Sequence, residues 1–206
     1  MKQCRKIPVY LLLLVVLLSL SACGEKRPEA TTVCVVKGGK LKQILVDQAP
    51  DYTESELQEY TEDKIAAYLE TEKEGDVKLD SCKEVDGVVY MELLFGSAAD
   101  YSAMTGLPCF FGTLEEAVDA GTAPAGTLVA PDGTTVEFSA LLAEHPDYHM
   151  LGLAENVLVQ TNKEILYSVA PATVTGERTA VIGDGNSDTS GYIPRMTDAP
   201  AYLIFE

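Results

Sequence analysis

The two histidines are the side chains best suited to metal chemistry, and they lie four positions apart in His145-Pro146-Asp147-Tyr148-His149. On a regular helix this spacing would place both imidazoles on one face, as in helical zinc sites. Pro146 lies between them and disfavours a regular helix, and the zinc-peptidase pattern H-E-x-x-H is absent. We therefore interpret the pair as part of a polar turn, with zinc binding as the alternative.

A second group of candidate ligands is the oxygen-bearing set Asp184, Asn186 and Asp188, which has the alternating spacing of a calcium loop. Such a loop also requires glycine at its sixth position and a bidentate glutamate at its twelfth. Thr189 and Arg195 stand at those two positions. We expect a solvated loop at Asp184–Asp188, with weak calcium binding as the alternative.

Known catalytic and nucleotide-binding patterns are missing elsewhere in the sequence. Gly183-x-Gly185 has neither a third glycine nor a following helix, so it does not match a dinucleotide-binding loop. No G-x-S-x-G, S-x-x-K or cysteine nucleophile pattern occurs. The sequence therefore predicts no catalytic, cofactor-binding or metal-binding residue.

The most specific chemical signal is Leu20-Ser21-Ala22-Cys23, which is similar to the processing site of bacterial lipoproteins. Three basic residues and an apolar run from Val9 to Leu18 precede it, as in a secretory signal. The run has about a dozen residues, whereas a membrane-spanning helix needs roughly 20. The similarity implies that residues 1–22 are removed and that a diacylglyceryl group is attached to Cys23. Ordinary secretion after cleavage at Ala22 is the alternative.

Residues 23–32 form a short polar segment that we interpret as the acylated cysteine and a tether. Two acyl chains anchor a protein stably where one does not. The sequence thus predicts a lipid-anchored protein on the extracytoplasmic face of the cell membrane.

The chain is strongly acidic, with a formal charge of −17 that becomes −20 once the three cations of residues 1–22 are removed. This charge argues against nucleic acid as a partner. It also predicts that an anionic membrane surface repels the folded part. We interpret the acidity as favouring solubility, with a cationic ligand or partner as the alternative.

Three cysteines remain after Cys4 leaves with the signal and Cys23 is acylated, namely Cys34, Cys82 and Cys109. One disulfide with a free thiol and three reduced, buried cysteines are both compatible with this number.

The remaining sequence alternates between β-hairpins and helices. Helices are predicted over 53–71, where Thr53 and Glu56 form a capping-box pair, and over 97–106 and 113–121, with one or two turns at 139–144. We place Tyr60 on the buried face of the first helix.

Four hairpins are predicted from paired β-rich runs: 33–36 with 41–46, 77–85 with 88–95, 128–130 with 134–138, and 157–160 with 165–169.

Further short strands are expected at 179–182 and 201–205, separated by a loop over 183–198. Hairpins with inserted helices predict an α+β fold, in which a mainly antiparallel sheet carries about three short to medium helices. We expect residues 33–206 to form a single domain.

Four stretches of the sequence carry a family resemblance: Ala98-Ala99-Asp100-Tyr101, Phe110-Phe111-Gly112-Thr113 with Glu116-Ala117, Ile165-Leu166-Tyr167, and Ala201-Tyr202-Leu203-Ile204-Phe205. Through them the chain resembles a group of uncharacterised lipoproteins from gut-type Gram-positive anaerobes. The resemblance implies placement on the outer face of a single membrane. It implies no activity and no functional residue beyond Cys23.

These observations predict a non-enzymatic binding or interaction domain with a possible protein partner at the membrane surface. The alternative is a small cell-surface hydrolase with an acidic site. A pocket with converging carboxylates of raised pKa would favour the hydrolase, whereas a flat apolar patch would favour a protein partner.

Overall fold

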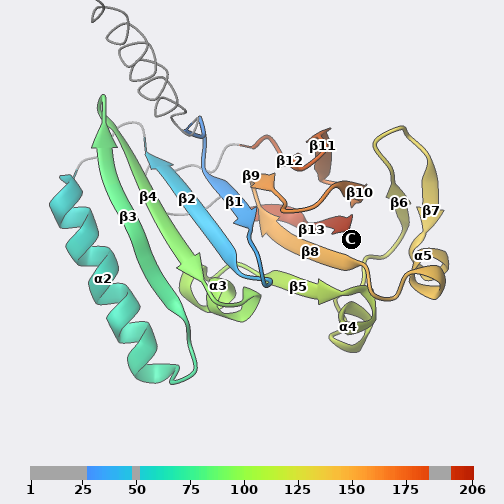
Figure 1. The fold of residues 1–206 in the computed structure, drawn as a ribbon, viewed down its shortest axis with the longest axis horizontal. Coiled ribbons are helices and arrows are strands. Elements are labelled where there is room, and N and C mark those ends of the chain that lie inside the picture. Colours follow the sequence, from blue (N-terminus) through green and yellow to red (C-terminus); the bar gives the residue numbers. More distant parts are fainter. Residues whose placement is uncertain (1–26, 48–51, 186–195) are drawn as a thin grey trace, which may run out of the picture.

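The computed structural model describes residues 27–47, 52–185 and 196–206, which form two β-sheets and four α-helices (Figure 1). Both sheets are mostly antiparallel. The fold is therefore α+β, as the sequence predicts, although the strands divide between two sheets.

Sheet A contains seven strands in the order β11-β12-β9-β1-β2-β4-β3. Its one parallel pairing joins β1 and β9. The strands are β1 (Thr32–Val35), β2 (Leu41–Asp47), β3 (Val77–Val85), β4 (Val88–Phe95), β9 (Val157–Gln160), β11 (Ala172–Gly176) and β12 (Thr179–Ile182).

Sheet B contains six antiparallel strands in the order β5-β8-β13-β10-β6-β7. The predicted loop over 183–198 is wrong at its end, because β13 begins at Met196. The strands are β5 (Cys109–Thr113), β6 (Thr127–Val129), β7 (Thr135–Glu137), β8 (His149–Glu155), β10 (Ile165–Val169) and β13 (Met196–Phe205).

Three of the predicted hairpins are confirmed: β1–β2, β3–β4 and β6–β7. The tightest of them turns at Asp86 and Gly87, whose φ angles of 56° and 81° are those of a two-residue hairpin loop. Gly87 has no Cβ and adopts this left-handed geometry without strain.

The fourth predicted hairpin is wrong, because β9 belongs to sheet A and β10 to sheet B. β9 pairs with β1 and β12, and β10 pairs with β13 and β6. Thr161 explains the change of direction: its backbone N–H donates to the carbonyl of Arg178, and its hydroxyl donates to the carbonyl of Lys163. The residue after β9 is thereby bonded to Arg178 in the turn between β11 and β12, and the chain passes from sheet A to sheet B.

The helices are α2 (Glu54–Thr71), α3 (Ala98–Thr105), α4 (Leu114–Asp119) and α5 (Phe138–Glu144). The capping boxes predicted at the starts of α2 and α4 are both present. α2 runs beside β3, so only a narrow stripe of Leu57, Thr61 and Ile65 is buried (Figure 1). Tyr60 lies outside this stripe and is 57% exposed, so its predicted burial is wrong.

The two sheets share the main hydrophobic core, which includes Val33 and Phe95 from sheet A and Leu153, Leu203 and Phe205 from sheet B. The opposite side of sheet B packs against α4 and α5 in a second cluster. Figure 1 places α2 and the α4–α5 pair at opposite sides of the molecule. The fold thus leaves the region between α2, α3 and sheet A as the place where a pocket can form.

Candidate functional site

A pocket of ≈ 610 Å³ lies where α2 and α3 approach sheet A. Its walls are mainly apolar and include Leu45, Met91, Leu93 and Met104. A volume of this size and character is typical of small-molecule sites, which are commonly about 300–1,000 Å³ and mostly apolar.

Helix packing and residue size account for the space. The buried stripe of α2 packs against β3 and β4, where Leu57 meets Val89 and Met91. On the pocket side the two helices present Ala67 from α2 and Ala103 from α3. These two short side chains fill little of the space, although Tyr68 of α2 does reach Asp100 of α3.

The charged residues that line the pocket are Asp47, Lys64 and Glu155, of which Glu155 is the buried one. Glu155 lies at the end of β8, where the chain passes from sheet B to sheet A. The residue is 0% exposed. The Tyr101 hydroxyl donates a hydrogen bond to Glu155 Oε2, and Gln43 Nε2 donates to Tyr101 Oη over 3.0 Å. Gln43 Nε2 also lies 3.5 Å from Glu155 Oε1. The three side chains form a buried chain of hydrogen bonds, in which each bond polarises the next.

Burial raises the pKa of Glu155 to about 7, because the charged carboxylate is desolvated, while the hydrogen bond from Tyr101 acts in the opposite direction. Burial also raises the pKa of Tyr101 well above its ordinary range, so the phenol stays a donor. Near neutral pH the Glu155 carboxyl is thus present in both protonation states. It can accept a hydrogen bond from a ligand or donate one to it.

Glu155 was not predicted from the sequence, and neither was β8. The available signal was the apolar run from Met150 to Val159, which contains only Glu155 and Asn156 as polar residues. A charged residue inside such a run is rarely buried without a partner. That pattern marks Glu155 as a candidate functional residue, but its partners Tyr101 and Gln43 are distant in sequence.

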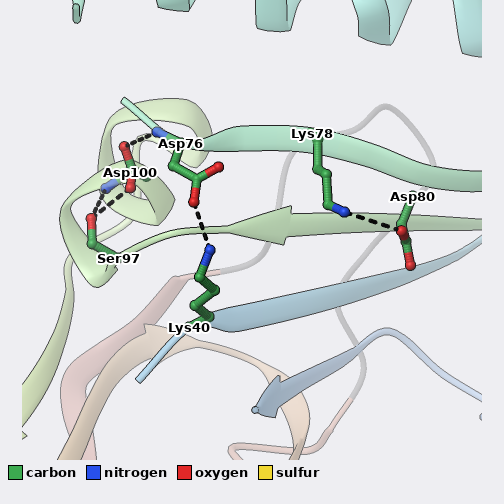
Figure 2. Close-up of polar contacts among 6 residues, drawn as sticks. All are labelled: Lys40, Asp76, Lys78, Asp80, Ser97 and Asp100. Carbon is green, nitrogen blue, oxygen red and sulfur yellow. Dashed lines mark hydrogen bonds and ion pairs between the residues drawn. The ribbon is translucent and has the colours of Figure 1, made fainter. Parts of the chain in front are cut away.

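A second polar junction holds the pocket walls together and is drawn in Figure 2. Asp100 is buried in the first turn of α3, and its Oδ2 accepts a hydrogen bond of 2.7 Å from the N-cap residue Ser97. Its Oδ1 accepts from the Tyr68 hydroxyl of α2 at 2.8 Å and from the backbone N–H of Asp76 at 3.2 Å. One carboxylate therefore ties α2, α3 and the start of β3 to each other.

Lys40 extends this junction to β2, because its Nζ lies 2.7 Å from Asp76 Oδ2 (Figure 2). The neighbouring pair Lys78–Asp80 is longer, at 3.7 Å, and both side chains are about half exposed. Exposed pairs of this kind contribute about 0–1 kcal/mol, so we assign the bracing of the pocket to Asp100.

The histidines do not form the helical pair considered above. His145 caps the end of α5 and stacks on Tyr148, with ring centroids 4.3 Å apart, whereas His149 begins β8 and stacks on Phe111 and Phe205. In the described ranges, no cluster of three or more His, Cys, Asp or Glu side chains is arranged to hold a metal ion.

The acidic segment Asp184–Asp188 is described only at its beginning. The backbone N–H of Asp184 donates to Asn156 Oδ1 over 3.2 Å, which attaches this residue to the segment following Glu155. Asn186 and Asp188 lie outside the described residues, so the expectation for this loop remains a prediction.

The three cysteines are free thiols in three separate places. Cys34 lies on the outer side of sheet A, Cys82 lies beneath α2, and Cys109 packs against the main core. Burial raises the pKa of each thiol, so the reactive thiolate is disfavoured. The three thiols are thus free, and Cys82 is buried, whereas Cys34 and Cys109 are half-buried.

Cys23 and the signal segment 1–22 lie outside the described residues, so the lipid attachment remains a prediction. Among the helices that the structure describes, none combines the length and the apolar character needed to cross a membrane. No family model, curated protein or solved structure matches this chain.

Proposed function

We propose that this chain is a lipid-anchored, non-enzymatic binding protein on the extracytoplasmic face of the membrane. Its ligand is a small, mainly apolar molecule that carries one hydrogen-bonding group. The observation that carries the proposal is the apolar pocket of ≈ 610 Å³ with the buried carboxyl of Glu155 among its lining residues. The signal segment and Cys23 supply the argument for the anchor.

The apolar lining favours recognition of a ligand by its shape, and the buried Glu155 adds a hydrogen-bonding requirement. Met91 and Met104 are unbranched and adapt to the outline of a ligand, whereas Leu45 and Leu93 extend from the sheet. A ligand whose polar group forms a hydrogen bond with Glu155 should bind more tightly than one without such a group, because an unpaired polar group in a buried site costs free energy.

A surface hydrolase is less well supported by this pocket. A hydrolase of the type considered above needs a second catalytic group beside the first, such as a nucleophile or another carboxyl of raised pKa. In the described lining, Glu155 is the carboxyl whose pKa is raised, and its Oε2 is already engaged by Tyr101. This geometry favours binding over bond cleavage.

The proposal is tested with a matched pair of helix variants. Both alanines are exposed, but Ala67 lines the pocket and its neighbour Ala66 does not. The indole of Ala67→Trp would occupy the space between the helices, and Ala66→Trp would point into solvent with the same change of helix propensity.

Binding of N-phenyl-1-naphthylamine, a neutral apolar fluorophore, is measured for both variants and the wild type. We expect Ala67→Trp to weaken binding by about tenfold or more, and Ala66→Trp to leave it nearly unchanged. Equal affinity of all three proteins would show that the pocket is not the binding site.

A further inference from the structure

A second concave surface lies on the outer face of sheet A, opposite the core, and we call it the outer groove. It encloses ≈ 1290 Å³ and is lined by residues of β1, β2, β3, β4 and the turn after β9. None of the four described helices contributes to its lining. Five cations line it, with Glu92 as the one acidic residue: Arg27, Lys37, Lys42, Lys83 and Arg178.

Strand alternation explains why polar side chains gather there. Val89, Met91 and Leu93 of β4 are directed towards the core side, so the residues between them, Tyr90 and Glu92, are directed outward. The same alternation along β2 directs Lys42 and Ile44 outward. The outer groove is thus the polar side of the sheet, and its cations come from five separate segments.

Most of this positive charge is available to a ligand. Lys42 is paired with Glu92 at 2.9 Å, and that hydrogen bond raises the pKa of the lysine. Lys37, Lys83 and Arg178 are exposed and take part in none of the three ion pairs found among the described residues. A chain of net charge −17 therefore carries one locally cationic surface.

The start of the described chain lies against the same surface. The guanidinium carbon of Arg27 is 5.3 Å from the ring centroid of Tyr90, a cation–π contact, and Pro28 also lines the groove. Cys23 is four residues before Arg27, and four extended residues span at most about 14 Å. A lipid on Cys23 would hold the outer groove close to the headgroups, where the electrostatic screening length is about 8 Å at physiological salt.

We infer that the outer groove binds the phosphate groups of anionic phospholipid headgroups and so holds the outer face of sheet A against the bilayer. This inference rests on the proposed lipid attachment at Cys23. It replaces the expectation, drawn from net charge alone, that an anionic membrane repels the whole folded part. In this orientation α2 and the pocket with Glu155 face away from the membrane and stay open to ligands.

The test uses the lipidated, signal-cleaved protein in vesicles of phosphatidylcholine, with or without phosphatidylglycerol. Lysine acetylation rates are measured by mass spectrometry. We expect phosphatidylglycerol to slow acetylation of Lys37, Lys42 and Lys83 about threefold or more, and high salt to reverse this protection. Lys64 and Lys73 on the α2 side are internal controls whose rates should not change.

Charge reversal provides the matched variants. In a Lys37→Glu, Lys83→Glu double variant, protection of Lys42 should disappear, whereas a Lys64→Glu, Lys73→Glu double variant should retain it. Equal acetylation of Lys37 and Lys83 in both kinds of vesicle would overturn the inference. Protection by soluble inorganic phosphate, without further protection by phosphatidylglycerol, would also overturn it.

Flotation with neutral vesicles separates this inference from the proposed anchor. Protein that floats but shows no lysine protection refutes membrane binding by the groove and leaves the anchor intact. Protein that does not float refutes the lipid attachment, and the inference fails with it.

Discussion

Replacing Glu155 with glutamine should change how the stability of this protein depends on pH. The wild-type carboxyl must lose its proton in a buried site as the pH rises, whereas the Glu155→Gln side chain stays neutral. The amide oxygen of the glutamine can still accept the hydrogen bond from Tyr101. The substitution therefore removes the ionisation and keeps the shape and the acceptor.

The size of the effect follows from the pKa, which burial raises from 4.5 to about 7 in the folded state. The folded protein holds this proton more tightly than the unfolded chain, so wild-type stability decreases as the pH rises between these two values. Each pKa unit corresponds to about 1.4 kcal/mol, which makes the full loss about 3 kcal/mol above pH 7. The wild type has already lost part of this stability at pH 5. The free energy of unfolding of Glu155→Gln, relative to that of the wild type, should therefore increase by about 2 kcal/mol between pH 5 and pH 8.

The assay is urea unfolding followed by circular dichroism at both pH values for both proteins. Comparison with the variant isolates the contribution of Glu155, because all other titratable groups are common to the two proteins. Glu59→Gln on the exposed side of α2 is the control and should follow the wild type. If the difference between Glu155→Gln and the wild type is the same at pH 5 and pH 8, the assignment of a raised pKa to Glu155 is refuted.

Two further predictions concern the anchor and the bracing of the pocket. Cys23→Ala should move the protein from the membrane fraction to the medium or block processing of its signal, as seen by fractionation and gel mobility; an unchanged distribution contradicts lipid attachment. Asp100→Ala should lower the free energy of unfolding by about 3 kcal/mol, because the Tyr68 hydroxyl and the Asp76 N–H lose a buried acceptor. Asp80→Ala, which removes an exposed ion pair, should cost less than about 1 kcal/mol in the same urea titration; equal losses would contradict the bracing role of Asp100.

Local features of the fold were predictable because their causes lie within a few residues. The capping boxes Thr53–Glu56 and Thr113–Glu116 join groups three positions apart, and they mark the starts of α2 and α4 correctly. The turn at Asp86-Gly87 likewise requires backbone angles that glycine adopts easily. The α+β class follows from such signals added along the chain.

Strand partners were less predictable, as β9 and β10 show. Their sequences and the turn between them are typical of a hairpin, but the hydrogen bonds of Thr161 to Lys163 and Arg178 carry the chain from one sheet to the other. β8 was missed because a run that is buried on both sides has no alternation to mark it as a strand.

The sequence by itself determined the caps, the turns, the fold class and the prediction of an anchor at Cys23, because each is encoded by neighbouring residues. Only the tertiary structure placed Gln43, Tyr101 and Glu155 together, since they come from three distant elements. It also placed the cations of the outer groove on one face of an acidic protein. Burial, pKa and surface charge depend on which atoms surround a group in space, and chain folding across long sequence distances decides that.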